Sequence, residues 1–174
     1  MSKSERSPLQ SIPDAVWTPL VTGLITFVPG IVGVATGRLL LFPSLGPTAI
    51  MQAHDPENPN SRFYNAVVSH LVGLGSAFLA VMLFGIAHAP SIFEVKHLSW
   101  ERVGASVLAV AMAAALEMLL RASHPPAVST TLLASLGSFH PTVRDTITVT
   151  VGVLIVAGVG ELFRRMRAGS HNAH

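Results

Sequence analysis

The sequence contains no cysteine and little charge. None of its 174 residues is a cysteine, which excludes disulfides, thiolate metal sites, iron–sulfur clusters and cysteine nucleophiles. Asp, Glu, Lys and Arg make up only 11% of the chain, against about 25% in a soluble domain. Half of the residues are hydrophobic, and the mean hydropathy is +0.56. This composition predicts an integral membrane protein.

Four apolar stretches are long enough to cross a membrane. Residues 15–37 and 63–93 carry no charged side chain, and each exceeds the length of about 20 residues that a helix needs to span the hydrocarbon core. Residues 102–122 and 146–163 contain few charges and supply a third and a fourth span. We therefore expect an all-α fold, a polytopic membrane helix bundle with four transmembrane helices.

The basic residues indicate how the bundle is oriented. Lys and Arg accumulate in cytoplasmic loops, and the cluster "RRMR" at 164–167 follows the last span directly. A four-span path then places both termini in the cytoplasm, with a bacterial inner membrane as the expected setting. Six crossings give the same distribution of basic residues, so segment length alone favours four. Because orientation already explains the basic cluster, no nucleic-acid partner is expected.

The order of segments recurs once along the chain. We divide the sequence into a polar leader (1–14), a membrane domain (15–163) and a basic tail (164–174), with one repeat over 15–88 and a second over 98–163. An offset of 83 residues (100 minus 17) superposes, without a gap, Trp17 on Trp100, Arg38 on Arg121, Pro43 on Pro126 and Thr48 on Thr131. Identity at this offset is otherwise low. The shared order of features therefore carries the prediction of a two-fold internal repeat.

Each repeat contains a proline-rich break followed by a short apolar segment. The breaks are "FPSLGPTA" (42–49) and "RASHPPAVSTT" (121–131). A residue before proline avoids the helical region, and proline lacks the N–H group that a helix requires, so a span ends there and a new helix begins. The short segments, 48–53 and 127–138, cannot cross a core of about 30 Å. We therefore expect two re-entrant half-helices beside a polar cavity, since unpaired backbone at membrane depth needs protein or water around it.

The beginnings of the two half-helices form a candidate anion site. Free backbone N–H groups, the positive end of the helix dipole and Ser or Thr hydroxyls together attract a small anion. We expect the substrate to contact Ser44, Gly46, Thr48, His70, His124, Pro126, Ser129, Thr130 and Thr131, with Arg38 and Arg121 adding positive potential at the entrance. Two alternatives stay open: His124 could cap the end of a span, and His70 could form a structural hydrogen bond to a neighbouring helix.

Three motifs resemble the HPP family of integral membrane proteins, which is described as having four spans. They are "SHPPAVSTT", the upstream "PSLGPTA", and "VVSHLVG" around His70. The resemblance covers residues 17–163 and reaches, position by position, Ser44, Leu45, Gly46, Pro47, Thr48, Ala49, His70, His124, Pro125, Pro126 and Ala127. It departs after Ala127, where Val128, Ser129 and Thr130 replace the family's usual Gly-Ala-Thr. Plastid and cyanobacterial members are implicated in nitrite transport. The resemblance therefore implies a transporter or channel for a small monovalent inorganic anion, nitrite first.

Other functions remain open at this point. A non-transporting membrane scaffold or assembly protein would use the breaks only to pack a compact bundle. An intramembrane enzyme would need Ser44 or Ser129 as nucleophile, but the sequence has no GxSxG motif and no carboxylate placed to orient His124, so we expect no enzyme. No histidine pair has the spacing of a helix-borne metal site, and neither metal nor cofactor is expected. Four spans are few to enclose a pathway, so we expect a homo-oligomer such as a dimer in the lipid bilayer.

A few further residues carry packing information. Gly33 and Gly37 form a GxxxG motif, which predicts close approach of two helices. Trp17 and Trp100 are interpreted as anchors at the lipid–water interface. Glu117 and Arg121 are one helical turn apart, and we expect them to form an ion pair rather than a proton relay.

Overall fold

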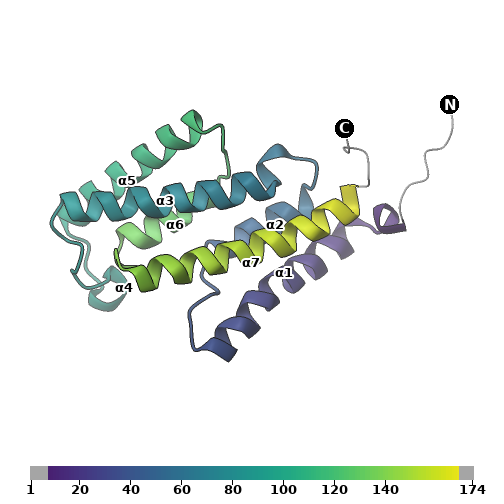
Figure 1. The fold of residues 1–174 in the computed structure, drawn as a ribbon, viewed down its shortest axis with the longest axis horizontal. Coiled ribbons are helices and arrows are strands. Elements are labelled where there is room, and N and C mark those ends of the chain that lie inside the picture. Colours follow the sequence, from purple (N-terminus) through teal and green to yellow (C-terminus); the bar gives the residue numbers. More distant parts are fainter. Residues whose placement is uncertain (1–7, 169–174) are drawn as a thin grey trace.

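Four long helices form the body of the molecule. The computed structural model describes residues 8–168 and contains, in this range, only helices and the loops that join them. The long helices are α1 (Asp14–Thr36), α3 (Phe63–Leu83), α5 (Trp100–Leu119) and α7 (Val143–Ala168) (Figure 1). Each is long and apolar enough to cross a membrane. The predicted all-α class with four helical spans is confirmed.

Two short helices follow the two proline-rich breaks. α2 (Leu45–His54) has 10 residues and α6 (Ala127–Ser135) has 9, which corresponds to about 15 Å at the helical rise. α2 begins before Thr48, where the sequence predicted its start, and Pro47 lies in its first turn. Proline is accepted there because the first N–H groups of a helix have no intrahelical partner. Single turns form α4 (Ile92–Val95), η1 (Pro8–Ser11) and η2 (Pro59–Ser61).

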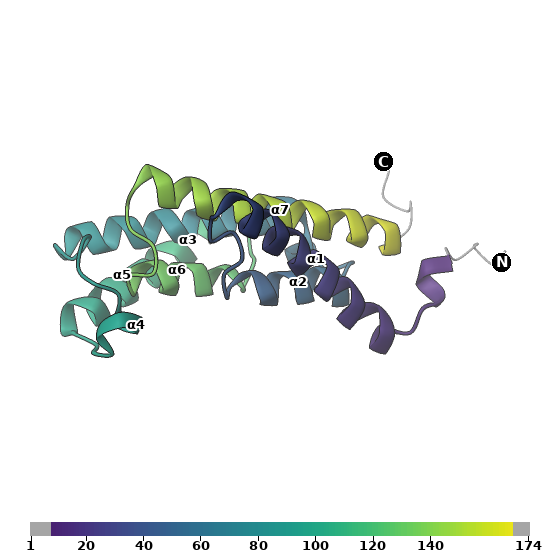
Figure 2. The ribbon, with the colours of Figure 1, turned by 90° about the horizontal axis from the view of Figure 1, so that it is seen from below.

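α3 and α7 form the centre of the bundle, and the other helices pack on them in two groups. α5 and α6 pack on α3 and on each other, whereas α1 and α2 pack on α7 and on each other. Figure 1 shows the central pair with α5 on one side and α1 on the other, and Figure 2 shows the same pair from below. Exchanging α1 with α5, α2 with α6 and α3 with α7 leaves this set of contacts unchanged. The arrangement is compatible with the two-fold repeat, which stays a prediction.

The segment after α1 advances along the bundle. Arg38 donates to the Thr148 hydroxyl, near the start of α7 (3.5 Å), and the Gln52 amide donates to the carbonyl of Ala157, further along the same helix (3.3 Å). Residues 38–54 therefore run in the same direction as α7. The sequence predicted a re-entrant helix, which would return to the end of the bundle from which it came. The observed path is different: an extended segment plus a half-helix leads toward the end where α1 began.

The segment after α5 follows the same kind of path. α5 ends where α3 begins, since the Tyr64 hydroxyl donates to the carbonyl of Leu120 (3.2 Å). α6 ends where α5 begins, since Arg102 donates to the carbonyl of Ser135 (2.9 Å). The chain thus passes along the bundle six times, in four continuous helices and two interrupted segments. The non-helical residues before each half-helix cover part of the path, because a chain that is not coiled advances up to about 3.3 Å per residue against about 1.5 Å in a helix.

Both described ends of the chain lie at the same end of the bundle. Asp14 at the start of α1 forms an ion pair with Arg167 near the end of α7. The Arg167 guanidinium also lies 4.8 Å from the centre of the Trp17 ring, whose Nε1 donates to the carbonyl of Ala53 at the end of α2 (3.1 Å). Trp17 is therefore buried between helices, whereas the sequence suggested an interfacial anchor; Trp100 is exposed.

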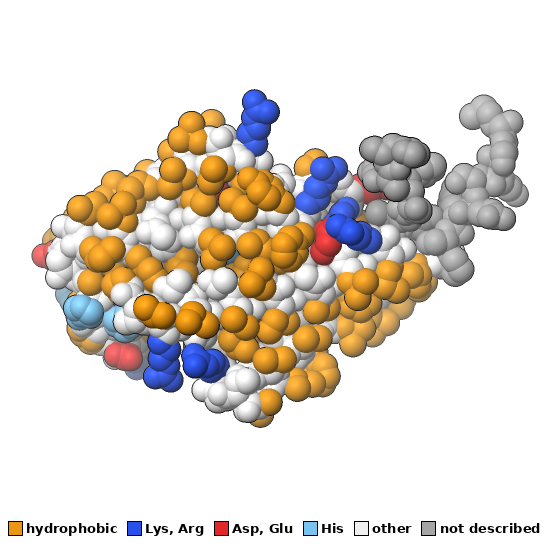
Figure 3. All heavy atoms as spheres, viewed as in Figure 1, with side chains coloured by type: hydrophobic (Ala, Val, Ile, Leu, Met, Phe, Trp, Pro, Cys, Tyr) orange, Lys and Arg blue, Asp and Glu red, His pale blue; other side chains and the backbone are white. Residues whose placement is uncertain are grey.

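Hydrophobic side chains dominate the surface. They cover most of the face shown in Figure 3, and charged side chains appear mainly at its margins. Large apolar side chains are exposed on several long helices, among them Phe27 of α1 (61%) and Val107 of α5 (66%). Contact between water and an apolar surface of this extent is unfavourable, and soluble proteins rarely expose one. The surface is that of an integral membrane protein.

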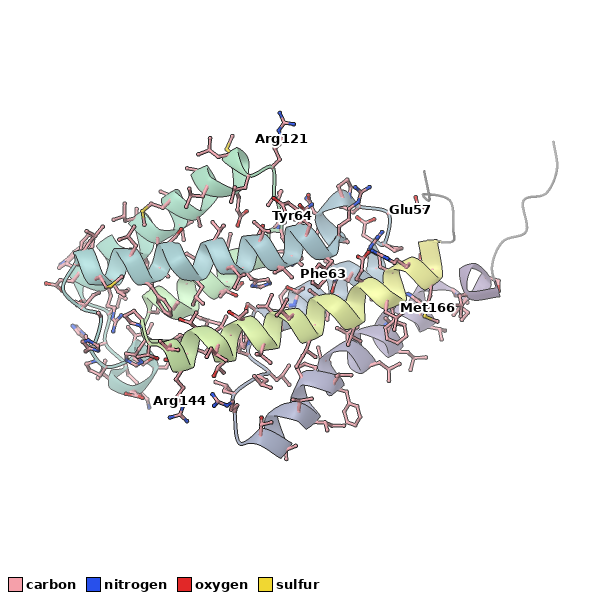
Figure 4. The ribbon with its side chains drawn as sticks, in the orientation of Figure 1. Glu57, Phe63, Tyr64, Arg121, Arg144 and Met166 are labelled. Atoms are coloured by element: carbon pink, nitrogen blue, oxygen red, sulfur yellow. The ribbon has the colours of Figure 1, made fainter. Side chains whose placement is uncertain are left out.

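Cysteine labelling distinguishes the six-pass path from a four-crossing one, because the natural chain has no cysteine. Glu57 and Met166 lie at the same end of the bundle (Figure 4), whereas Lys96 ends α4, at the other end. We predict that a membrane-impermeant maleimide labels Glu57→Cys and Met166→Cys from the same side of the membrane and Lys96→Cys from the opposite side. Two re-entrant helices would instead place Lys96→Cys on the side of Met166→Cys.

Gly152 lets the segment after α1 lie directly against α7. A Cβ atom at this position would stand 2.6 Å from the carbonyl oxygen of Leu40 and 3.0 Å from the ring of Phe42. The carbonyl belongs to the backbone of the interrupted segment, so it cannot rotate away as a side chain could. At Gly158, on the same helix, a Cβ atom would have no neighbour within 4 Å.

This close approach predicts opposite effects of two alanine substitutions in α7. Gly152→Ala should lower the free energy of unfolding by about 1–3 kcal/mol, the usual cost of overpacking. Gly158→Ala should raise it by up to about 1 kcal/mol, because alanine favours a helix over glycine. Thermal unfolding in detergent measures both. Equal stability of the two variants would contradict the packing of residues 38–44 on α7.

Candidate functional site

The turn after α1 uses both glycines of the GxxxG motif. Gly37 has a φ of 63°, which glycine adopts without the steric cost that a side chain imposes. The N–H of Arg38 donates to the carbonyl of Gly33 (3.0 Å), and a Cβ atom on Gly33 would lie 2.8 Å from the carbonyl oxygen of Arg38. The motif therefore closes this turn, whereas the sequence suggested a contact between two helices.

The turn after α5 has the same hydrogen-bond pattern without a glycine. Arg121 has a φ of 50°, and the N–H of Ala122 donates to the carbonyl of Glu117 (2.9 Å). The Arg121 side chain is exposed and points away from the bundle (Figure 4). The ion pairs of residues 8–168 do not include Glu117 with Arg121. The predicted pair is therefore not formed, because Arg121 lies beyond the last helical turn.

The first backbone N–H groups of both short helices are already bonded. In α2 the N–H of Leu45 donates to the carbonyl of Phe42 (3.0 Å). In α6 the first three N–H groups donate to carbonyls three residues earlier, at 2.9, 3.2 and 3.1 Å for Ala127, Val128 and Ser129. Each helix thus begins with a tight turn. The free amides that the sequence predicted as anion ligands are not free in this conformation, and the available groups at the two helix starts are side chains.

The two helix starts meet through their hydroxyl groups. Ser44 occupies the N-cap position of α2, and Thr130 lies in the opening turn of α6. Their hydroxyl oxygens are 2.7 Å apart, although the residues are separated by 86 positions in the sequence. The structure thus brings the two proline-rich breaks into direct contact.

Two histidines extend this contact into a continuous network. His70 on α3 lies with Nδ1 2.6 Å from the Thr130 hydroxyl and with Nε2 2.9 Å from the Thr48 hydroxyl. The same Thr48 hydroxyl is 3.0 Å from Nε2 of His124, and the two imidazole rings are 5.4 Å apart. Nδ1 of His124 ends the network 2.8 Å from the carbonyl of Asn60 in η2. Five predicted site residues thus share one set of hydrogen bonds, and we call these side chains the hydroxyl–imidazole network: Ser44, Thr48, His70, His124 and Thr130.

The hydroxyl–imidazole network is closed to solvent. Ser44, His70, His124 and Thr130 are 0% exposed, and Thr48 is 1% exposed. Buried polar groups destabilise a protein unless they form hydrogen bonds, and here each of the five side chains has at least one partner within the network. The network therefore stabilises this conformation. A ligand enters only by replacing some of the internal hydrogen bonds.

The other predicted substrate contacts lie beside the network. Gly46, Pro126 and Ser129 are partly exposed on the opening turns of the two short helices. Thr131 is buried, and its hydroxyl donates to the carbonyl of Ala127 in its own helix (3.4 Å). None of these four residues has a side-chain hydrogen bond to the network among the hydrogen bonds of residues 8–168.

The two predicted entrance arginines lie at the surface. Arg38 is exposed and reaches Thr148, and Arg121 is exposed on the other group of helices. Neither guanidinium forms a hydrogen bond to the hydroxyl–imidazole network within the described part of the chain. Their positive charge can act on the site only over a longer distance.

Asn60 and Gly73 belong to the site, although the sequence analysis did not identify them. Asn60 contributes its backbone carbonyl, which every residue carries, so no residue type could have marked it. Gly73 lies on α3 one turn after His70, where a Cβ atom would collide with the Thr131 hydroxyl. A glycine inside a span can mark such a close approach, so the motif "VVSHLVG" did contain this signal.

Fold and site together define a class of protein: a helical membrane protein in which two interrupted segments meet in a buried polar network. The family model described as "HPP, transmembrane region" matches residues 7–172. The chain therefore belongs to the HPP family of membrane proteins, as the motifs around His124 and Thr48 implied. Comparisons with curated proteins and with solved structures give no match.

The network predicts that removing the Thr130 hydroxyl lowers the free energy of unfolding more than removing the Ser44 hydroxyl does. Thr130→Val leaves both the Ser44 hydroxyl and Nδ1 of His70 without a partner, and an unsatisfied buried polar group costs about 1–3 kcal/mol. Ser44→Ala leaves Thr130 bonded to His70, so it should lower the free energy of unfolding less. Thr150→Val is the control, because the Thr150 hydroxyl bonds only within its own helix (2.7 Å). Equal losses for Ser44→Ala and Thr130→Val would contradict the network.

Proposed function

We propose that this protein transports a small monovalent anion across the membrane, with nitrite as the first candidate. The proposal depends on one observation: the starts of two interrupted segments meet in a buried network of hydroxyl and imidazole groups. Interrupted helices that meet inside a bundle form the substrate sites of several classes of secondary transporter. Membership of the HPP family, whose plastid and cyanobacterial members are implicated in nitrite transport, supports the same function.

The chemistry of the network suits a small anion of single charge. Its side chains offer O–H and N–H donors and contain no carboxylate. Both short helices also direct the positive ends of their dipoles toward it. A nitrite ion has two oxygens that can accept from donors on both helices. A divalent anion would need fixed cations to balance its charge, and the hydroxyl–imidazole network contains none.

Transport requires the network to open. The five side chains are at most 1% exposed, so the substrate would exchange with internal hydrogen bonds. Replacing the hydrogen bonds of Thr48 with bonds to the substrate would open the network most, because the Thr48 hydroxyl joins both histidines. The interrupted segments, 37–44 and 120–126, are the parts best suited to move. They lack the regular hydrogen bonds of a continuous helix, and such regions open at the lowest cost.

Anion uptake into proteoliposomes tests the proposal. The purified protein should carry nitrite into liposomes faster than protein-free liposomes take it up. Thr48→Val should slow this uptake about tenfold or more, which corresponds to a loss of about 1.4 kcal/mol, because it removes the hydroxyl that joins the two histidines at nearly constant volume. Thr150→Val should leave uptake unchanged. If nitrite, nitrate, formate and chloride all fail to move, transport is not the function.

The complete internal pairing of the network favours a second candidate, a non-transporting membrane scaffold or assembly protein. In that case the hydroxyl groups only hold α2 and α6 together. Substitutions such as Ser129→Ala and Thr131→Val would then change thermal stability or partner binding, and no variant would affect anion movement. Measuring stability and uptake on the same variants separates the two candidates.

We also propose that the end of the bundle with Asp14 and Arg167 faces the cytoplasm of a bacterial cell. Arg164, Arg165 and Arg167 gather there at the end of α7, and cytoplasmic ends of membrane proteins are enriched in basic residues. Maleimide labelling of Met166→Cys in intact cells and in inside-out vesicles tests this orientation. Labelling in intact cells would contradict it.

A further inference from the structure

The carbonyl of Asn60 determines the direction of the hydrogen bond at one end of the network. A carbonyl oxygen only accepts, so Nδ1 of His124, 2.8 Å away, carries the proton in this contact. In a neutral imidazole ring the other nitrogen is then an acceptor. Nε2 of His124 therefore accepts from the Thr48 hydroxyl, 3.0 Å away.

This direction extends through the remaining members. A hydroxyl has one proton, so Thr48, which donates to His124, accepts from Nε2 of His70 (2.9 Å). Nδ1 of His70 is then the acceptor for the Thr130 hydroxyl (2.6 Å), which in turn accepts from Ser44 (2.7 Å). The carbonyl of Ser44 competes for the same Thr48 proton, but it lies farther away, at 3.2 Å, than Nε2 of His124. In every hydrogen bond of this network the donor therefore lies on the side of the contact between α2 and α6, and the acceptor lies on the side of η2.

We propose that this one-way chain relays a proton between His70 and His124 and thereby couples proton movement to anion transport. The inference rests on the proposed function of the same site. It goes further by identifying the co-transported ion and the side chains that carry it. Chains of hydrogen bonds between groups that both donate and accept are the paths along which protons move in proteins, and here Thr48 links the two imidazole rings.

The relay step conserves protons and electrons. When the network opens to admit the anion, a proton from water binds Nδ1 of His70, and the Thr130 hydroxyl turns its own proton away so that its oxygen accepts from the new N–H group. The proton on Nε2 of His70 then passes to the Thr48 oxygen while the Thr48 proton passes to Nε2 of His124. Nδ1 of His124 releases its proton to water near Asn60. One proton enters and one leaves, and no group is oxidised or reduced.

Electrostatics explains why the anion and the proton would move together. A protonated imidazole inside an apolar bundle is costly unless a negative charge accompanies it. A monovalent anion at the network supplies that charge, and proton plus anion cross as a neutral pair. After the transfer, the unprotonated Nδ1 of His124 faces the carbonyl of Asn60, so two acceptors oppose each other. A second turnover therefore requires both imidazole rings and the Thr48 hydroxyl to turn, so that a protonated nitrogen of His124 again faces Asn60 and one of His70 again faces Thr48, without the transferred proton running back.

One end of the relay, at Asn60, lies close to the solvent. Asn60 is half-exposed in η2, at the bundle end that holds both described ends of the chain. Among the described residues, the half-buried carboxyl group of Glu117 on α5 lies beside the Ser69 side chain and the backbone of His124. The other titratable groups on the surrounding helices lie toward the bundle ends, most with partners of their own: Asp14 with Arg167, Glu161 with Arg164 and Arg165, Arg102 with three carbonyls, and His54 with Thr18.

Nuclear magnetic resonance of nitrogen-15-labelled histidine tests the direction of the chain. In the full-length protein in lipid, at a pH where both rings are neutral, we expect the Nδ1–H tautomer for His124 and the Nε2–H tautomer for His70. The chain has eight histidines, so spectra of His70→Gln and of His124→Gln assign the two signals, each by the loss of one. This measurement requires no transport. The opposite tautomer at either ring would overturn the one-way chain.

Proton movement during nitrite uptake tests the coupling. With the membrane potential clamped and protein-free liposomes as the background, the unmodified protein should move protons together with nitrite near neutral pH. His70→Gln keeps a hydrogen-bonding side chain, but the amide lacks the two ring nitrogens that let imidazole take up one proton and release another. We expect its proton-to-nitrite ratio, measured on whatever nitrite uptake the variant retains, to fall by a factor on the order of ten or more. His97→Gln, which changes an exposed histidine, should keep the original ratio.

The possible outcomes separate the relay from the proposed function. Nitrite movement without proton movement in the unmodified protein would overturn the relay and leave nitrite transport standing. Absence of nitrite movement would overturn the transport function and with it the coupling. If His70→Gln does not fold, the pair Thr48→Ser and Thr48→Val replaces it. Thr48→Ser keeps the linking hydroxyl and should retain the proton-to-nitrite ratio. A lower ratio in Thr48→Ser would count against the relay.

Discussion

The hydrogen bond between Ser44 and Thr130 joins two interrupted helices inside an apolar bundle, and the arrangement of the bundle depends on it. A bilayer offers no water to polar groups, so a helix break survives there only if protein groups replace the lost partners. Tight turns at the starts of α2 and α6 provide acceptors for the opening backbone N–H groups. The two histidines provide hydrogen-bond partners for the Thr48 side chain. The breaks and the hydroxyl–imidazole network therefore require each other.

Stability and the proposed anion transport make opposite demands on this network. Every member is buried and bonded within the protein, which favours the closed conformation. Each internal hydrogen bond contributes only about 0.5–1.5 kcal/mol net, however, because an alternative partner recovers most of the loss. An anion that accepts from the same donors is such a partner. The donors therefore stabilise the closed state when no substrate is present and remain available to a substrate that opens it.

The site is less symmetric than the fold. The helix contacts are unchanged when the two halves are exchanged, yet the repeat offset pairs His70 with Val153 and His124 with Leu41. Only one half of the molecule can therefore form a pair of imidazoles. Thr48 has a threonine equivalent in Thr131, but that hydroxyl bonds within its own helix. The proposed one-way chain of hydrogen bonds needs such asymmetry, since two equivalent halves would have no preferred direction.

The sequence by itself determined the helical class, the four spans, the two breaks and five residues of the network. Apolar length and proline act locally along the chain, and an ionisable residue at depth, such as His70, is conspicuous among apolar neighbours. Only the tertiary structure decided that the broken segments advance along the bundle, that their opening amides are already paired, and that the Asn60 carbonyl ends the network. The path of the segments and the end of the network depend on contacts between residues 33 to 110 positions apart, and the pairing of the amides depends on backbone groups that are the same in every residue. No local pattern in the sequence specifies them.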